Sequence, residues 1–473
     1  MSTVETATLK DGRTVRYLSD VIGEGGMKRV HFTADRSSVV CFFKDQAAAG
    51  DPQRLARLDA VVGRYNPTLD PKTGGYWKNL FCWPTDIVVR PGLGLLAPAY
   101  PANFFFGSGP WKGKEKEGRW FYSPKLSRML PDVERGTWQS YLAICVLMAR
   151  AVRRLHQAGL AHSDLSCKNV LIDPSAGRCA VIDIDGLVVP GLYPPDVAGT
   201  PGYIAPEVLA TMSLDPKDPN RRHPSARTDQ HSLAVLIYET LLGRHPLRGP
   251  KVNSAAGAEE DELLSMGAKA LWVEHPADKS NRPADLTVPA ASLGAGVAGL
   301  FETAFVKGLH DPAERPTALE WERALIKTWD ALLPCAGARC TRKWFVFPES
   351  GGACPFCGTR PPGPVPVLKL HKEGPPGEWR QDGYVAVYDR LVLFKWHALA
   401  NVFPGEEADR TPQAMCAFYN GQWILINKAL PSLTSPAGNP VAVEQAVALK
   451  PGERIRLSAE PQGRIAEVTF VNP

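Results

Sequence analysis

The stretch that decides the fold is "HSDLSCKNV", residues 162–170, which places an aspartate, a lysine and an asparagine in one short loop. Asp164 could accept a proton, and the amide oxygen of Asn169 could hold a hard metal ion such as Mg²⁺. Lys168 adds a cation just before Asn169. A base, a cation and a metal ligand in one loop favour a reaction in which all three converge on one phosphoryl group.

A second metal ligand follows this loop. The run "CAVIDIDG", residues 179–186, predicts a strand that ends on Asp183, whose carboxylate is a suitable ligand for Mg²⁺. Asp185 offers another carboxylate two residues later. Which of the two is the main ligand stays open, with Asp183 preferred.

The N-terminal part of the chain contains a glycine-rich run and a lysine that could bind phosphate groups. The run "IGEGGMKRV", residues 22–30, contains Gly23 and Gly25 at the close spacing of a phosphate-covering loop. Lys44 ends an apolar run that predicts a strand, which would point its ammonium into a cleft. Each signal alone has a common alternative: the glycine-rich run could be an ordinary tight turn, and Lys44 could be a solvated lysine.

Three further motifs complete the order of a known family. They are "GTPGYIAPEV" (199–208), "TDQHSLAVLIYETLLGRHPL" (228–247) and "DPAERPTALEW" (311–321). With them, residues 15–330 resemble a eukaryotic-like (Hanks-type) Ser/Thr protein kinase of bacterial type. The resemblance implies ATP and Mg²⁺ (or Mn²⁺) as cofactors and a bilobal fold.

The resemblance also assigns roles by position. Asp164 matches the catalytic base, Lys168 a cation that steadies the γ-phosphate, and Lys44 the lysine on the α- and β-phosphates. The remaining matches are Asn169 and Asp183 for the metal, and Gly23, Gly25 and Val30 for the nucleotide.

Several family residues have structural roles. Glu207 and Arg315 match an ion pair that fixes the activation segment, and Asp229 matches an aspartate that hydrogen-bonds the backbone of the catalytic loop. His162 is expected to pack beneath that loop. Thr200 matches a threonine that braces it.

The departures from the family pattern carry information. Ser163 replaces an arginine that usually pairs with a phosphate, so activation by phosphorylation, for example on Tyr193, is not expected. Lys28 stands at the third glycine of the loop. Phe42 would narrow the adenine pocket, and Asp59 is the nearest acidic candidate to pair with Lys44.

Four of the ten cysteines cluster near residue 345. The spacing is Cys-x4-Cys, thirteen residues, then Cys-x2-Cys, which is typical of a tetrahedral structural zinc site. Disulfides or an iron–sulfur centre are the alternatives. The four residues are Cys335, Cys340, Cys354 and Cys357.

The C-terminal residues follow a proline-rich run, "RPPGPVP" (360–366), which is typical of a semi-rigid spacer. Beyond it, short runs alternate apolar and polar residues, and Asn420–Gly421 predicts a type I′ hairpin turn. The last strands resemble those of forkhead-associated-type β-sandwiches. We expect an interaction domain here.

The predicted fold class is therefore α+β: a bilobal kinase fold, a small zinc ribbon and a β-sandwich-like domain. The predicted bounds are 1–98 for the N-lobe, 99–333 for the C-lobe, 334–360 for the zinc ribbon, 361–365 for the linker and 366–473 for the β-rich domain.

Composition excludes several classes of protein. The net charge of +5 is spread along 473 residues, which does not indicate a nucleic-acid partner. The N-terminus has no apolar signal segment, and the apolar run at 141–152 is too short for a membrane span and contains Arg150. We expect no membrane partner, a cytoplasmic location and a buried helix at 141–152.

The predicted function is ATP-dependent phosphorylation of Ser/Thr residues in a protein substrate. The arrangement is similar to kinases of tellurium-resistance-type stress modules, which implies a von Willebrand factor A-domain protein and a PP2C-type phosphatase as partners. The alternative is a pseudokinase scaffold that binds partners without catalysis.

Overall fold

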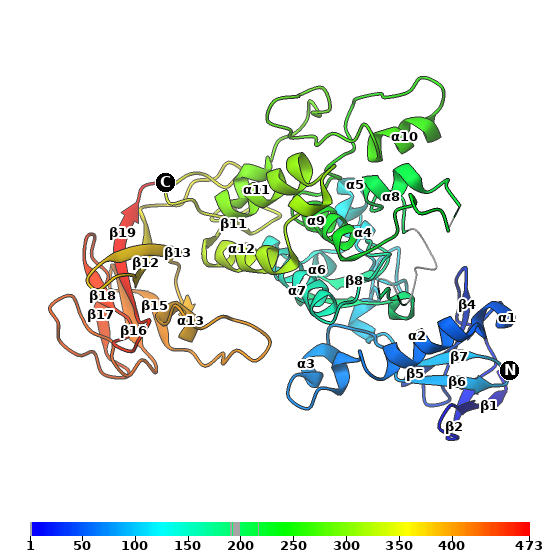
Figure 1. Ribbon diagram of the computed structural model, residues 1–473. Helices are drawn as coiled ribbons and strands as arrows, with labels where there is room; N and C mark the ends of the chain where they lie inside the picture. Colours follow the sequence, from blue (N-terminus) through cyan, green and yellow to red (C-terminus); the bar gives the residue numbers. More distant parts are fainter. Residues whose placement is uncertain (1, 190–191, 193–198, 216) are drawn as a thin grey trace. The chain divides into compact units, whose positions relative to one another are not determined.

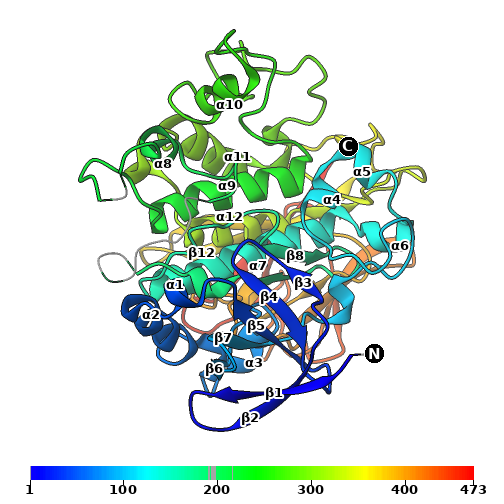
Figure 2. The ribbon, with the colours of Figure 1, turned by 90° about the vertical axis from the view of Figure 1, so that its right-hand side faces the viewer.

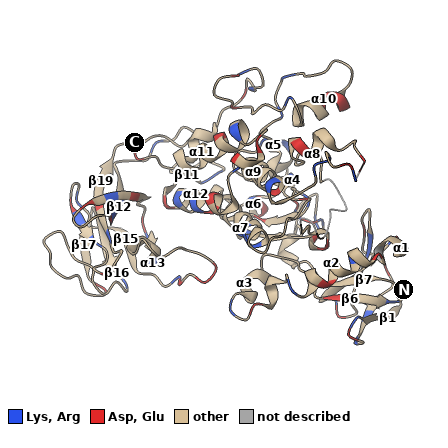
Figure 3. Cartoon of the chain, viewed as in Figure 1, with Lys and Arg blue, Asp and Glu red and all other residues tan. Residues whose placement is uncertain are grey.

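The computed structural model describes residues 2–189, 192, 199–215 and 217–473. They form two compact units (Figure 1). Basic and acidic side chains are interspersed along both units (Figure 3). Within the described ranges, no helix is long and apolar enough to cross a membrane. Unit 1 comprises Met1–Gly136, Ser140–Thr287 and Gly299–Glu322, and unit 2 comprises Thr137–Gln139, Val288–Ala298 and Arg323–Pro473.

Unit 1 begins with an antiparallel sheet of seven strands in the order β2-β1-β6-β7-β5-β4-β3, drawn in blue in Figure 2. Helix α2 (Pro52–Val62) lies along it, because Leu58 packs against Phe43 and Leu95. The last strand ends at Pro98, where the N-lobe was predicted to end. The strands are β1 (Val4–Leu9), β2 (Thr14–Leu18), β3 (Gly23–Glu24), β4 (Lys28–Phe32), β5 (Ser38–Phe43), β6 (Asp86–Arg90) and β7 (Gly94–Pro98).

The rest of unit 1 is mainly helical and is built around α9 (Ala226–Leu242), which is buried along nearly all its length. The side chain of Ser225 caps its start. A short hairpin of β8 (Val170–Asp173) and β9 (Arg178–Val181) carries the motif loops. Other helices of unit 1 are α1 (Gln46–Ala49), α3 (Gly74–Lys78), α4 (Arg119–Tyr122), α5 (Pro124–Ser127), α6 (Asp132–Arg135), α8 (Pro206–Thr211) and α10 (Ala258–Met266). Three helices contain residues of both units: α7 (Trp138–Gln157), α11 (Ala295–Glu302) and α12 (Ala318–Asp330).

The apolar run at 141–152 lies within α7 and is largely buried, as predicted. Its one charged residue, Arg150, is compensated. Arg150 Nε donates to Glu322 Oε1 at 2.6 Å, and Arg153 Nε donates to Glu322 Oε2 at 2.7 Å. Because Glu322 is fully buried, these paired charges fix α7 against α12.

Unit 2 contains two four-stranded antiparallel sheets, β13-β12-β19-β18 and β14-β15-β16-β17. Their inward side chains share one core, with Leu368 and Val468 from the first sheet and Cys416 and Leu425 from the second. The elements are β12 (Val365–Glu373), β13 (Trp379–Ala386), β14 (Val392–Leu393), α13 (Lys395–Ala398), β15 (Ala414–Tyr419), β16 (Gln422–Asn427), β17 (Ala446–Ala448), β18 (Arg454–Arg456) and β19 (Arg464–Val471).

The predicted hairpin turn at Asn420–Gly421 is present between β15 and β16. Both residues have positive φ, 47° for Asn420 and 81° for Gly421, as a type I′ turn requires. The register pairs Tyr419 with Gln422 across the turn. The alternating pattern of this segment therefore identified its local structure correctly.

The cysteine-bearing segment is not separate from the β-domain, contrary to the predicted division at 361–365. Its hairpin, β10 (Leu332–Pro334) and β11 (Trp344–Val346), supplies Phe345 to a core that also contains Val367 of β12 and Ala386 of β13. The expected spacer runs directly into β12 at the buried Val365. Apolar side chains on both sides of the proline run pack together, so the two predicted domains share one core.

Candidate active site

The loop at 162–170 is fixed from below by Asp229 in the first turn of α9. Its Oδ2 accepts a hydrogen bond from His162 N at 2.7 Å, and its Oδ1 accepts one from Ser163 N at 3.2 Å. The buried His162 places Nε2 2.9 Å from Ile182 O. Both predicted roles are confirmed. Ser163 has a left-handed backbone (φ 68°), which costs about 1–3 kcal/mol and persists only where surrounding bonds enforce it.

Asp164 is held at both carboxylate oxygens. Thr200 Oγ1 donates to Asp164 Oδ1 at 2.7 Å, and Asn169 Nδ2 donates to Asp164 Oδ2 at 2.9 Å. Asn169 Nδ2 also lies 2.8 Å from Asp164 O. Because both carboxylate oxygens accept hydrogen bonds, the carboxylate of Asp164 is held in one orientation. The bracing role predicted for Thr200 is confirmed.

Asn169 and Asp183 are brought together by the β8–β9 hairpin. Ile182 N donates to Asn169 O at 3.0 Å, so Asp183 follows directly beside the catalytic loop. Asp183 has φ 60°, a second left-handed backbone among these polar residues. Because the amide nitrogen of Asn169 is used on Asp164, Oδ1 is the atom through which Asn169 could hold a cation.

Lys28 of β4 reaches the same carboxylates. Its Nζ lies 3.0 Å from Asp183 Oδ1 and 2.6 Å from Asp185 Oδ1. Burial disfavours the charged ammonium, but the attraction of Asp185 and Asp183 outweighs it and raises the pKa of Lys28. Burial likewise opposes the charge on Asp183, yet Lys28 lowers the pKa of Asp183. Both groups therefore remain ionised near neutral pH.

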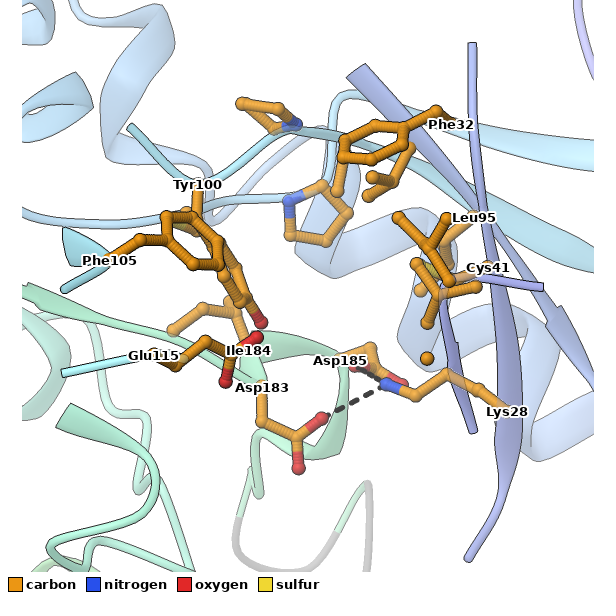
Figure 4. A pocket seen from close by; sticks show the side chains of 18 residues that line it. Lys28, Phe32, Cys41, Leu95, Tyr100, Phe105, Glu115, Asp183, Ile184 and Asp185 are labelled. Atoms are coloured by element: carbon orange, nitrogen blue, oxygen red, sulfur yellow. Dashed lines mark hydrogen bonds and ion pairs between the residues drawn. The ribbon is translucent and has the colours of Figure 1, made fainter. Parts of the chain in front are cut away.

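These groups border a cavity of about 320 Å³ between the sheet and the helical part of unit 1 (Figure 4). Figure 4 shows Lys28, Cys41 and Leu95 on the sheet side, facing Tyr100 and Phe105. Dashed lines join Lys28 to the two aspartates. The full lining is Ile22, Gly23, Lys28, Val30, Phe32, Val39, Cys41, Cys82, Pro84, Leu95, Ala97, Pro98, Tyr100, Phe105, Glu115, Asp183, Ile184 and Asp185.

The cavity has the character of a small-molecule site. Most of its wall is apolar, and its charged groups gather at the aspartate end. Gly23 and Val30 belong to the lining, whereas Gly25 does not. Glu115 faces the cavity as well, and burial, with a smaller effect of Glu117, raises the pKa of Glu115.

Lys44 does not lie where the sequence analysis placed it. It is exposed, it is absent from the cavity lining, and its Nζ lies 2.8 Å from Glu24 Oε1. The reason is strand alternation: Val39 and Cys41 of β5 face the cavity, so an even-numbered residue points away from it. The placement of Lys44 in the cleft is therefore wrong.

Two related expectations are also corrected. Phe42 does not narrow the cavity, because it faces the other side of the sheet and packs edge-on against Tyr17 and His31. Asp59 does not pair with Lys44, since its carboxylate lies 2.5 Å from Lys10 Nζ at an exposed position. The error at Phe42 follows from the misjudged face of β5, whereas Asp59 has a different partner, Lys10, which directly follows β1.

The remaining cation of the loop, Lys168, is exposed, and its backbone N donates to Ser166 Oγ at 3.4 Å. It lies beside Asn169 in the chain and does not line the cavity.

The sequence alone showed Lys28 and Asp185 only as departures from the family motifs, and did not predict that they line the cavity. A usable signal was present, because Lys28 lies two residues before Val30 and so shares its face of the strand.

The activation segment is fixed at its C-terminal end. Arg315 forms a two-pronged ion pair with Glu207, with Nη1–Oε1 at 2.8 Å and Nη2–Oε2 at 2.7 Å. The guanidinium is almost completely buried. This predicted pair is confirmed. Tyr193 lies outside the described residues.

The four clustered cysteines of unit 2 converge. Their sulfur atoms all lie within 4.8 Å of one another. The sulfurs of Cys335 and Cys357 are 3.4 Å apart, and those of Cys340 and Cys354 are 3.9 Å apart. Four sulfurs held about 2.3 Å from a tetrahedral zinc ion lie about 3.8 Å apart, so these separations are compatible with a zinc site.

Comparison with known proteins agrees with this geometry. Residues 127–320 match the protein kinase domain. The chain is 35% identical over 128 residues to human serine/threonine-protein kinase MRCK gamma, an alignment that covers 26% of this chain and 8% of that protein. It is 24% identical over 212 residues to serine/threonine-protein kinase PknL of Mycobacterium tuberculosis, covering 41% and 50% respectively.

Among solved structures, a Toxoplasma gondii specific rhoptry antigen kinase domain aligns with a TM-score of 0.43 and 14% identity, over 69% of this chain and 86% of that one. The chain spans half or less of the curated relatives just named. Asp164, Asn169, Asp183 and Asp229 all lie inside the matched range. Residues 127–320 therefore correspond to a protein kinase domain, and the relatives named above are serine/threonine-protein kinases.

Proposed function

We propose that the protein transfers the γ-phosphoryl group of ATP, in a Mg²⁺-dependent reaction, to Ser or Thr hydroxyls of a protein partner or of itself, in bacterial signalling or stress response. The observation that carries this proposal is the arrangement of Asp164, held at both oxygens beside Asn169, with Asp183 next to them. It joins a proton acceptor to two metal ligands at the end of an apolar cavity.

Each residue has a defined task in this reaction. Asp164 accepts the proton of the attacking hydroxyl, and the hydrogen bonds from Thr200 and Asn169 keep its carboxylate oriented. Asn169 and Asp183 hold the metal through oxygen atoms, which suits Mg²⁺. When bound, ATP would supply the phosphoryl group, and Mg²⁺ would offset part of its negative charge. Lys168, exposed beside the metal ligands, steadies the γ-phosphate.

The second candidate function is a pseudokinase scaffold, which is favoured by the position of Lys44 outside the cavity. Incubating the purified full-length chain with radiolabelled ATP, with and without Mg²⁺, separates the two. We expect label on Ser or Thr only when Mg²⁺ or Mn²⁺ is present. Nucleotide binding without any transfer to self or to a generic substrate would favour the scaffold.

The cysteine cluster is proposed to hold one structural zinc ion through Cys335, Cys340, Cys354 and Cys357. The sulfur separations support this, as does the position of Cys340 and Cys354 in the core shared with β12 and β13. All four ligands come from the protein, which leaves no open position for catalysis. The metal would tie the two cysteine-bearing turns together beside this shared core.

The β-sandwich-like part of unit 2 is proposed to recruit protein partners in the cytoplasm. The tip of its β15–β16 hairpin exposes Phe418 (54%) and Tyr419 (62%), and exposed aromatic side chains are enriched at protein interfaces. A von Willebrand factor A-domain protein and a PP2C-type phosphatase are the partners proposed. Replacing both aromatics with Ala should weaken binding to such a partner in a pull-down with purified components.

A further inference from the structure

Lys28 occupies a special place in the cavity. Among the described residues of the lining, it is the one Lys, Arg or His side chain. It comes from β4, where Lys28 and Val30 lie two residues apart and both face the cavity. The Lys28 side chain is 19% exposed, so its charge lies largely out of water and needs an anionic partner.

The neighbouring strand explains why the cation comes from β4. The register pairs Val30 with Cys41 and Lys28 with Phe43. On β5 the cavity-facing positions are taken by Val39 and Cys41, which carry no charge, while Phe43 packs against Leu58 of α2. Without Lys28, the sheet side of the cavity would have no positive charge among the described residues.

The two partners of Lys28 have different positions. Asp183 is the more exposed, with a side chain 49% accessible, and it stands next to the metal ligand Asn169. Asp185 is 15% exposed and closer to the ammonium, at 2.6 Å. Asp185 can therefore keep Lys28 in place while Asp183 turns to a metal ion.

We propose that Lys28 is the residue that binds the phosphates of the nucleotide, that Asp185 positions it, and that Lys44 has no part in nucleotide binding. The proposal rests on the proposed function, because it assumes Mg-ATP in this cavity. A cation 3.0 Å from the carboxylate that holds the metal lies within reach of the phosphate oxygens bound to that metal. Asp185 takes the place of an acidic partner from α2, whose one carboxylate, Asp59, pairs with Lys10 instead.

The test compares two lysines that differ in place and not in chemistry. Binding of a fluorescent ATP analogue with Mg²⁺ is measured for the full-length wild type, Lys28→Met and Lys44→Met. We expect Lys28→Met to weaken binding at least about tenfold, because hydrogen bonds between charged groups are the strong ones. Lys44→Met should bind within about twofold of wild type, since an exposed ion pair contributes little.

Further variants keep the test decisive. Asp185→Asn should weaken binding less than Lys28→Met, as expected for a residue that acts through Lys28. Circular dichroism and the melting temperature establish that each variant is folded. If Lys28→Met does not fold, Lys28→Gln, which keeps a polar side chain of similar length, replaces it.

The outcomes separate the inference from the proposed function. Wild-type binding that Lys44→Met abolishes and Lys28→Met (or Lys28→Gln) leaves intact overturns the role of Lys28 and leaves the kinase function standing. A wild-type chain that binds no Mg-ATP overturns the proposed function itself. Selective loss in Lys28→Met supports the inference.

Discussion

The loop at 162–170 and the β4–β5 hairpin of the same unit differ in how well the sequence predicts their side-chain positions. In the loop, Asp164 and Asn169 lie five residues apart, and both meet as their spacing predicts. In the hairpin, Lys44 was placed in the cleft but lies outside it, and Lys28 takes that place. The relative positions of side chains within one short loop can be predicted from their spacing in the sequence. The relative positions of side chains on paired strands also depend on the register of the strands.

The physical reason is the two-residue period of a strand. A shift of one residue moves a side chain to the opposite face, so an error of one position in β5 exchanges Cys41 for Phe42 and removes Lys44 from the cavity. A tight loop has no such ambiguity, because its backbone is fixed by Asp229 and its short spacing leaves few arrangements. The following predictions test this comparison.

The largest effect is expected in the loop. Asp164→Asn removes the proton acceptor but keeps its shape, so the rate of phosphoryl transfer should fall on the order of 10²-fold or more while Mg-ATP still binds. Steady-state kinetics with a protein substrate provide the measurement. The control is Asp132→Asn, at an exposed aspartate paired with Arg135 of the same short helix, which should retain the wild-type rate. Equal rates for both variants would remove Asp164 from its role.

The cysteine cluster extends the comparison, since its ligands too were identified from spacing. Elemental analysis should find one zinc per chain, and the double variant Cys354→Ser/Cys357→Ser should lose it and destabilise unit 2. Cys82→Ser, at a cysteine far from the cluster in sequence, should keep the metal. Iron in the native chain, or no metal at all, contradicts the structural-zinc proposal.

A smaller effect is expected at Thr200, whose hydroxyl donates to Asp164. Thr200→Val should slow phosphoryl transfer about tenfold, which corresponds to the loss of one hydrogen bond to a charged group, whereas Thr200→Ser should keep most activity.

Phosphatase treatment of the protein should not change the rate of transfer, because Ser163 stands where an arginine would pair with a phosphate. Loss of activity after that treatment would show that a phosphate is required.

The smallest effect is expected at Asp59, which the sequence suggested as the partner of Lys44. Because Asp59 pairs with Lys10 at an exposed position, Asp59→Asn should leave the rate within about twofold of wild type. A large loss in steady-state rate would restore Asp59 as the partner of Lys44 and contradict its pairing with Lys10.

Much of the architecture was predictable from sequence, for particular reasons. The buried helix at 141–152, the Glu207–Arg315 pair and the type I′ turn at Asn420–Gly421 each depend on local pattern or on a family motif. The shared core of the cysteine segment and the β-domain was not predictable, because a proline run looks like a spacer whether or not its flanks pack together. Here Phe345 and Val367 meet across it.

A crystal structure of Asp164→Asn bound to Mg-ATP, in which transfer is strongly slowed, tests the arrangement of this site most directly. We expect Mg²⁺ within about 2.0–2.1 Å of oxygens of Asn169 and Asp183, Lys28 Nζ in contact with the phosphates, and Lys44 in solvent. A nucleotide whose phosphates contact Lys44, or a metal held away from Asn169 and Asp183, would contradict it.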